Sequence, residues 1–321
     1  MNLIPEWKTN TVILVLPNVL MEYYSEYLTE LDNFYANFLI EIAKHDQVIC
    51  LVPDHAHAEK MVKLTNLDLS IFKIANIEDI WIRDLAPIQS DQGYIKFIYN
   101  PDYDETLDYE SFEENYINHL KKLINNSVNI SFVDLKLDGG NFIHNGKGTA
   151  IMTEKLYHNN PHKTKEEVNQ LIKEKTFIDK LVVVPTEPGD ITGHIDGMLQ
   201  WIDSDRILIN DYHTQGDDFA SFAEKLDRCL EQQLPEVEKI KIPYFPSEEK
   251  YLGWYDEKGN YMNFLMTQNR VYAPIYNQPE DEAAQEIYTQ IFGQNVSFIE
   301  SGAISRYGGM LHCITWNYLA C

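Results

Sequence analysis

Apolar and polar residues follow two periods along this chain, and the two periods alternate from one end of the sequence to the other. Short runs of aliphatic and β-branched residues predict strands, whereas apolar residues spaced three and four apart predict helices. The first quarter of the sequence gives a strand at Thr11–Leu16, a helix over about Leu20–Lys44, a strand at Gln47–Val52, a helix over about His55–Leu64 and a strand at Leu69–Ala75.

The same alternation continues to the C-terminal region, after a predicted loop with a short strand at residues 77–90. Further strands are predicted at Gly93–Tyr99, Ile130–Leu135, Leu181–Pro185, Val237–Pro243 and Val296–Glu300. Hairpins are predicted for Leu137–His144 with Gly148–Thr153, Gly193–Asp203 with Arg206–Asp211, and Tyr261–Thr267 with Arg270–Pro274. Helices are predicted to end near Asn125 and to span Thr164–Lys175, Asp217–Gln233 and Glu280–Phe292. Thr164 and Glu167 have the spacing of a capping box.

Hairpin, helix and strand thus recur several times, and no low-complexity linker divides the sequence. This recurrence predicts an α/β body built from repeated units, in a single domain over residues 1–321. With 321 residues, 44% of them hydrophobic, the chain can bury a large core.

Cysteine is sparse, since the chain has only Cys50, Cys229, Cys313 and Cys321. A disulfide scaffold is therefore not expected, and the expected location of the protein is the reducing cytoplasm. The apolar run Thr11–Pro17 is too short to span a membrane. No basic segment with a cleavage site precedes that run, so it is interpreted as a strand and not as a signal peptide.

The formal net charge of -24 makes nucleic acid and anionic lipid poor partners for this surface. A cationic small molecule would be attracted to it. The alternative is that the acidic surface serves only solubility.

Four polar stretches fall at predicted strand ends or turns, where functional sites are commonly built. They are Arg83-Asp84 after Trp81, Asp138-Gly139-Gly140-Asn141, Gly193-His194-Ile195-Asp196-Gly197, and the C-terminal stretch around Cys313. His194 and Asp196 lie two residues apart, which on a strand would place both side chains on one face.

Each stretch also has a structural interpretation. A free cysteine is often a small buried hydrophobe, and a histidine can be a buried structural residue. Asp138 before two glycines is typical of a turn, and Asp84 could form a local ion pair with Arg83. Taken together, a thiol, an imidazole and several carboxylates favour chemistry on a cation. Paired carboxylates match the planar fork of a guanidinium, whose carbon needs a thiolate nucleophile and an acid for the departing nitrogen.

At this point the sequence resembles a known family. Its motifs are Trp81-x-Arg-Asp-x-Ala-Pro87, Asp138-Gly-Gly-Asn141, Gly193-His-x-Asp-Gly197, Tyr261-x-Asn-Phe264 and Gly308-Gly-x-x-His-Cys-x-Thr315. In this order they are similar to the motifs of the agmatine deiminase and bacterial, Porphyromonas-type peptidylarginine deiminase family of the guanidine-modifying (pentein) superfamily. The resemblance implies a five-bladed α/β propeller that hydrolyses a guanidinium to a ureido group and ammonia, with no cofactor and no metal.

The resemblance also implies a role for each matching residue. Cys313 matches the nucleophile that forms a covalent amidino intermediate, and His194 matches the acid and base. Asp138 matches the acidic residue that orients the histidine. The substrate-binding positions implied by the motifs are Asp84, Asp196, Asn263 and Trp81.

The substrate stays open at this stage, because Tyr307 and Ala86 stand where relatives often have glycine and the tryptophan-rich loop of agmatine deiminases is not evident. Agmatine is the leading substrate, with Asp102, Asp104 and Glu105 as candidates to hold its amine; those residues could equally belong to a solvated loop. Deimination of peptidyl or free arginine, with Arg306 as a candidate substrate-reading group, is one alternative, and amidino transfer is another. A zinc hydrolase and an inactive binding relative are less favoured, because the ligand spacing fits no recurrent zinc pattern and the polar residues are retained. Association into a homo-oligomer is left open.

Overall fold

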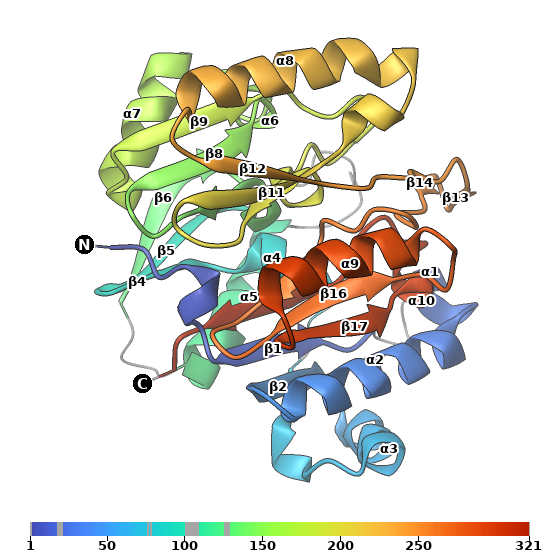
Figure 1. Cartoon of the computed structure of the whole chain (residues 1–321). Coiled ribbons are helices and arrows are strands. Elements are labelled where there is room, and N and C mark those ends of the chain that lie inside the picture. The colour runs from blue at the N-terminus through green and yellow to red at the C-terminus, as the bar shows by residue number, and fades with distance from the viewer. Residues whose placement is uncertain are drawn as a thin grey trace.

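The computed structural model describes residues 2–17, 22–75, 77, 79–99, 109–124 and 129–320. Within this part of the chain, five sheets share one topology (Figure 1). In each sheet the first two strands are antiparallel, and the third strand runs parallel to the second. A helix connects the second strand to the third, as a parallel connection requires.

The first sheet joins the two ends of the chain. Its strand order is β18 (Thr315–Tyr318), β1 (Thr11–Val15), β2 (Gln47–Val52) and β3 (Phe72–Ile74). The associated helices are α1 (Glu22–Ser25), α2 (Leu28–Ala43) and α3 (His55–Thr65), with the short turn η2 (Leu69–Ile71) before β3. The C-terminal strand β18 is therefore the first strand of this sheet. In each of the other four sheets, the first strand comes directly before the second strand in the sequence.

The next two sheets follow in chain order. The second consists of β4 (Ile88–Ser90), β5 (Gly93–Ile98) and β6 (Ile130–Lys136), with α5 (Tyr109–Ile124) between β5 and β6. The third consists of β7 (Ile143–His144), β8 (Thr149–Thr153) and β9 (Lys180–Val184), with α6 (Lys155–His158) and α7 (Lys165–Thr176) between β8 and β9.

The last two sheets repeat the pattern. The fourth consists of β10 (Leu199–Trp201), β11 (Arg206–Asn210) and β12 (Glu238–Ile242), with η5 (Tyr212–Thr214) and α8 (Asp217–Gln233) between β11 and β12. The fifth consists of β15 (Leu265–Met266), β16 (Val271–Ile275) and β17 (Val296–Glu300), with α9 (Asp281–Phe292) between β16 and β17. A small hairpin, β13 (Lys250–Tyr251) with β14 (Trp254–Tyr255), and the short helix α10 (Gly302–Ser305) lie outside this pattern.

A short turn or irregular segment precedes the first strand of each sheet. These segments are α4 (Ile82–Leu85) before β4, η3 (Gly139–Asn141) before β7, η4 (Ile195–Gly197) before β10, Tyr261–Phe264 before β15, and Leu311–Ile314 before β18. Every one of them belongs to a motif singled out in the sequence. The repeated topology therefore places the five polar motifs at equivalent positions of the five units.

The core is divided between the units, and the central strands are buried on both faces. Val12 and Leu14 of β1 pack with the apolar side chains of α2 and α3, whereas Ile13 and Val15 pack on the opposite face with α5 and Trp316. Successive side chains of a strand point to opposite faces, so each unit contributes to two apolar clusters. This explains why the strands read as continuous apolar runs, as expected for sheets covered on both sides.

The predicted elements are found, but five of them differ in extent or type. The helix expected over Leu20–Lys44 is divided into α1 and α2, and the strand expected at Leu69–Ala75 is η2 followed by β3. The predicted arms Leu137–His144, Gly193–Asp203 and Tyr261–Thr267 contain only short strands, because their first halves form the turns described above. The capping box is confirmed, since Thr164 Oγ1 accepts from the Glu167 N–H and a Glu167 carboxylate oxygen accepts from the Thr164 N–H. No helix in the described ranges is long and apolar enough to cross a membrane.

Candidate active site

His194 lies between two carboxylates that come from two other units. Its Nε2 is 3.2 Å from Oδ2 of Asp138, and its Nδ1 is 3.6 Å from Oδ1 of Asp84. All three side chains are buried. Burial opposes the charged imidazolium, but the carboxylates of Asp84, Asp138 and Asp196 raise the pKa of His194 to about 10. The ring is therefore an imidazolium at neutral pH, with a proton on each nitrogen. It can give one of these protons to a leaving amine.

Asp84 is held at the end of a hydrogen bond from the backbone of another unit. The N–H of Gly140 donates to Oδ1 of Asp84 over 2.8 Å. Burial raises the pKa of Asp84 to about 7, with His194 opposing the rise and the nearby carboxylates of Asp138 and Asp196 adding to it. Oδ1 of Asp138 is buried without a hydrogen-bond partner among the described residues. This region therefore carries more negative charge than its own cations balance.

Cys313 lies in the turn before β18, where Asn263 fixes the local backbone. Oδ1 of Asn263 accepts hydrogen bonds from the N–H groups of His312 (3.0 Å) and Cys313 (3.3 Å), and its Nδ2 donates to Sγ of Cys313 over 3.2 Å. Sγ is also 3.8 Å from Oδ2 of Asp196. Burial and the negative charges of Asp196 and Asp84 raise the pKa of the Cys313 thiol well above its ordinary value. Without a bound cation the sulfur therefore keeps its proton.

Trp81 packs against the glycine-rich segment that precedes Cys313. A Cβ on Gly309 would lie 2.5 Å from a ring carbon of Trp81, so only glycine lets the indole lie this close. The interpretation of Trp81 as a substrate-binding residue remains a proposal, because its observed contact is with the cysteine segment.

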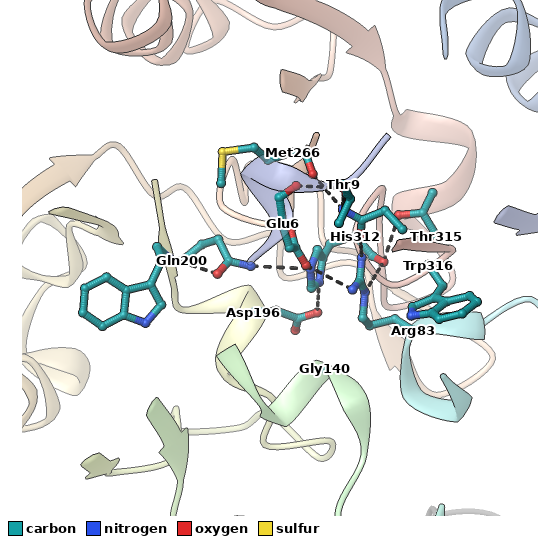
Figure 2. Close-up of polar contacts among 12 residues, drawn as sticks. Glu6, Thr9, Arg83, Gly140, Asp196, Gln200, Met266, His312, Thr315 and Trp316 are labelled. Atoms are coloured by element: carbon teal, nitrogen blue, oxygen red, sulfur yellow. Dashed lines mark hydrogen bonds and ion pairs between the residues drawn. The ribbon is translucent and has the colours of Figure 1, made fainter. Parts of the chain in front are cut away.

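A buried network of charges lies next to Asp196 (Figure 2). His312 contacts Asp196 through Nδ1 over 2.6 Å and Glu6 through Nε2 over 2.7 Å. Glu6 in turn lies 3.0 Å from Nη1 of Arg83. The local ion pair between Arg83 and Asp84 that the sequence suggested is therefore wrong, because Arg83 is turned toward Glu6 and pairs with it.

The strand geometry expected for His194 and Asp196 is also wrong. His194 is the residue before η4 and Asp196 lies within this turn, so the two side chains do not share a strand face. They nevertheless serve one site, because His194 faces Asp84 and Asp138 while Asp196 faces His312 and Cys313.

The structure brings together two sets of predicted residues. Asp84, Asp138 and His194 form one set, and Asp196, Asn263 and Cys313 form the other. A Cβ built on Gly140 would be 2.8 Å from Asp84 Oδ1, 2.8 Å from His194 Nδ1 and 3.2 Å from Asp196 Oδ2, so the two sets meet at this glycine.

Three other sequence-based hypotheses have different outcomes. Asp102, Asp104 and Glu105 lie outside the described residues. Arg306 is engaged elsewhere, with its guanidinium 3.3 Å from Glu30 and 3.9 Å from the centre of the Tyr27 ring. In the ranges that the structure covers, no three His, Cys, Asp or Glu side chains are grouped so as to hold a metal ion.

Sequence reasoning assigned no role to Glu6 or His312. His312 could have been found, because it stands inside the Gly308-Gly-x-x-His-Cys motif next to the nucleophile candidate. Glu6 carries no such signal, since it is separated from His312 by 306 positions and lies in an N-terminal turn, η1 (Glu6–Lys8), outside every motif.

Comparisons with known proteins agree with this geometry. The family model described as Porphyromonas-type peptidyl-arginine deiminase matches residues 2–318. The agmatine deiminase of Ectopseudomonas mendocina is 29% identical over 206 residues, which span 56% of this chain and 56% of that protein. The agmatine deiminase of Pseudomonas aeruginosa is 22% identical over 307 residues, spanning 85% of this chain and 83% of that protein.

Solved structures share the fold. The agmatine deiminase of C. jejuni superimposes with a TM-score of 0.85 at 21% identity, covering 99% of this chain and 96% of that one. A similarity at this level of identity shows the α/β fold, and the chemistry has to be argued from the side chains.

Proposed function

This chain belongs to the Porphyromonas-type peptidyl-arginine deiminase family, and we propose that it hydrolyses the guanidinium of agmatine to N-carbamoylputrescine and ammonia. The proposal is supported by relatives that are themselves agmatine deiminases. The observation that carries it is the position of Cys313, whose half-buried thiol lies 3.8 Å from a carboxylate oxygen of Asp196. The protonated His194 between Asp84 and Asp138 completes the required groups.

The charges of the site fit a cationic substrate. Four buried or half-buried carboxylates (Asp84, Asp138, Asp196 and Glu6) face three cations (His194, His312 and Arg83). One negative charge is left over. This agrees with the pKa of Asp84, which burial and the neighbouring carboxylates raise to about 7. A single guanidinium would balance it, and its planar fork of N–H donors suits two carboxylates.

The same charge balance accounts for activation of the nucleophile. The negative charges of Asp196 and Asp84 raise the pKa of the Cys313 thiol, so a bound guanidinium would lower it by offsetting them. Activation would then depend on the substrate being in place. Asn263 would stabilise the resulting thiolate through the hydrogen bond from its Nδ2.

The proposed reaction has two halves. In the first, the Cys313 thiol releases its proton to bulk water as the guanidinium binds, and Sγ forms a bond to the guanidinium carbon. His194 then gives its proton to the departing nitrogen, the carbon–nitrogen bond breaks, and ammonia leaves an amidino thioether on the enzyme. In the second, His194 takes a proton from water, the hydroxide adds to the same carbon, and the carbon–sulfur bond breaks. The thiol is regenerated and the product carries the ureido group. Asp138, 3.2 Å from Nε2 of His194, would hold the ring in position through both halves.

For the fold, we propose that the five sheets are the blades of a five-bladed α/β propeller formed by the single domain 1–321. The shared topology supports this, as does the placement of one site motif before the first strand of each sheet. The site would then lie on the central axis, where the five motifs converge.

Deimination of peptidyl or free arginine is the second candidate. It is favoured by the description of the matching family, whose model is the peptidyl-arginine deiminase one. The guanidinium chemistry would be the same, and the difference would lie in how the remainder of the substrate is held. Arg306, which pairs with Glu30, is not placed as a group that reads this remainder.

The test is ammonia release from agmatine, free arginine, arginyl peptides and methylated arginines, each with an added amine acceptor in a parallel reaction. Release from agmatine with the highest kcat/KM supports the proposal, whereas a preference for arginyl peptides moves the assignment to the second candidate. Transfer to the amine without ammonia release would identify an amidinotransferase.

A further inference from the structure

His312 is buried with a carboxylate at each ring nitrogen. Nδ1 is 2.6 Å from Oδ2 of Asp196, and Nε2 is 2.7 Å from Oε1 of Glu6. The side chain is only 2% exposed, so water does not take the place of either partner. Figure 2 shows the ring lying between the two acidic groups.

This geometry determines the protonation state of the ring. A carboxylate offers only acceptor oxygens, and a neutral imidazole has only one N–H. A neutral His312 would therefore turn a nitrogen lone pair toward a carboxylate at hydrogen-bond distance. Only the imidazolium, with a donor on each nitrogen, satisfies both contacts. Gln200 also approaches Nε2, but at the longer distance of 3.4 Å.

Arg83 holds Glu6 from the other side. Its Nη1 lies 3.0 Å from Oε1 of Glu6, its Nε donates to the carbonyl of His312 over 3.3 Å, and its Nη2 donates to Oδ1 of Asn317 over 2.7 Å. Asn317 is fixed in turn by hydrogen bonds to Thr9 and Met266. The two cations and two anions thus alternate in one row, Asp196, His312, Glu6 and Arg83, in which only Glu6 is half-buried and the others are buried.

The row ends next to the sulfur. Oδ2 of Asp196, the oxygen that faces His312, is also the oxygen 3.8 Å from Sγ of Cys313. The orientation of this carboxylate therefore depends on His312, and the orientation and charge of His312 depend on Glu6.

We propose that His312 and Glu6 are positioning residues, which act through Asp196 to hold its carboxylate correctly turned for the guanidinium beside Cys313. This inference rests on the proposed function and adds to it two residues outside the predicted set. Asp196 would otherwise be a buried anion whose Oδ2 lacks its partner at 2.6 Å and is free to rotate. The pKa of His312 is raised: burial and the charge of Arg83 lower it, but the carboxylates of Glu6 and Asp196 outweigh them.

The experiment uses Glu6→Gln in the full-length protein. Glutamine keeps an acceptor for Nε2 of His312 but removes the charge that stabilises the imidazolium. His312 would then lose its proton at lower pH, because an opposite charge nearby is what favours the charged form. The other titratable or charged groups that face this network are Asp196, Arg83 and, next to Glu6, His144, whose pKa burial lowers to about 4.

The first readout is nitrogen NMR of the His312 ring in the wild-type protein. Both ring nitrogens are expected to be protonated from about pH 6 to about pH 8. An ordinary histidine, with a pKa of about 6.5, would lose one of these protons within this range. The second readout is kcat/KM for the guanidine substrate against pH. Glu6→Gln is expected to reduce it about tenfold or more at about pH 8 relative to the wild type, and this ratio should shrink toward about pH 6, with both proteins measured at the same pH, as the imidazolium re-forms.

Asp227→Asn is the matched control, because Asp227 accepts from a histidine at 2.6 Å in an exposed pair with His213. It should leave the pH profile unchanged. A neutral His312 at pH 7 in the wild-type protein would overturn the inference. So would a loss in Glu6→Gln that is equal at every pH and accompanied by a lower Tm, since that pattern indicates a structural role alone.

The outcomes also separate this inference from the proposed function. If Glu6→Gln does not fold, the NMR measurement on the wild-type protein still decides the state of His312. If the wild-type protein releases no ammonia from any guanidine, the proposed function fails, and with it the catalytic part of the inference. The imidazolium assignment would be decided independently by NMR.

Discussion

The backbone N–H of Gly140 donates a 2.8 Å hydrogen bond to the carboxylate of Asp84, although the two residues come from different units of the fold. A side chain on this glycine would collide with Asp84, His194 and Asp196 at once. The absence of a Cβ is therefore what allows these three groups to converge.

Gly140→Ala is expected to lower kcat/KM by about a hundredfold, because a displacement of about 1 Å at a reacting site has an effect of that size. The added methyl carbon would lie 2.8 Å from both Asp84 Oδ1 and His194 Nδ1. Gly197→Ala is the control, since its nearest neighbour would be Asn260 at an ordinary 3.7 Å. Steady-state kinetics on both variants, with Tm measured in parallel, provide the check. Equal activities would show that the site does not depend on this close approach.

Cys313→Ala and Cys313→Ser are expected to abolish turnover while the fold is kept. The sulfur is the nucleophile in the proposed reaction, and its contacts with Asn263 and Asp196 are few enough to be lost without unfolding. Ammonia release and Tm are the measurements. In the wild-type protein, mass spectrometry of a quenched reaction should find an adduct on Cys313. Substantial turnover by the alanine variant would contradict the assignment.

Much of this fold could be predicted because the period of the apolar residues changes clearly between elements. The strand Gln47–Val52 has its predicted ends, and the helix capped by Thr164 begins where predicted. The turns around His194 and Asp138 could not be predicted in the same way. Their residues alternate like a strand, but the backbone forms tight turns that direct the side chains into the site.

The site itself was predicted only as far as its motifs reach. Cys313 and His194 belong to recognisable motifs, whereas Glu6 enters the site through the packing of an N-terminal turn against the C-terminal strand. Such a contact depends on how the two ends of the chain meet in the first sheet. The partner of Arg83 could not be predicted for the same reason, because Glu6 lies far from it in sequence.

Glu187→Gln is expected to make the stability less dependent on pH. Burial raises the pKa of Glu187 to about 7, against the opposing effect of hydrogen bonds from Tyr212 and Tyr244. In the unfolded chain the pKa of a glutamate is about 4.3. Between this pKa and that of the folded state only folded Glu187 holds the proton, so the free energy of unfolding falls as pH rises.

Urea unfolding of wild type and Glu187→Gln at pH 5 and pH 8 measures this effect. The wild-type protein should lose more stability between the two pH values than the variant does. Glu231→Gln, an exposed change of the same charge on α8, is the control and should follow the wild type. A variant with the full pH dependence of the wild type would show that Glu187 is not protonated in the fold.

Chelation is expected to leave ammonia release unchanged. Both ring nitrogens of His194 already face Asp138 and Asp84, and Cys313 contacts Asn263, so the proposed reaction uses these groups without a metal. The measurement is activity after prolonged dialysis against a chelator, together with metal analysis of the protein. Stoichiometric zinc, with activity lost on its removal and regained on its return, would favour the metallohydrolase hypothesis instead.

Asp84→Asn and Asp196→Asn are expected to reduce kcat/KM by about 2–5 kcal/mol, the range for removing one partner of a buried charge pair. Asparagine keeps the size of the side chain but loses the charge, and its NH2 group opposes the N–H donors of a guanidinium. Because the sulfur must approach the guanidinium carbon from outside its plane, a loss of orientation lowers kcat as well as raising KM.

The two variants should differ in their pH profiles. In the wild-type protein, kcat/KM should rise with pH up to about 7, because the raised pKa of Asp84 leaves this carboxyl partly protonated below that value. Asp84→Asn should lose this acidic limb, whereas Asp196→Asn should keep it. Asp203→Asn, which removes an exposed partner of Arg206, should match the wild type in both rate and profile. If Asp84→Asn and Asp196→Asn both retain near-parental kinetics with a guanidine substrate, the substrate is held elsewhere. The family and fold would then no longer support this assignment of the site.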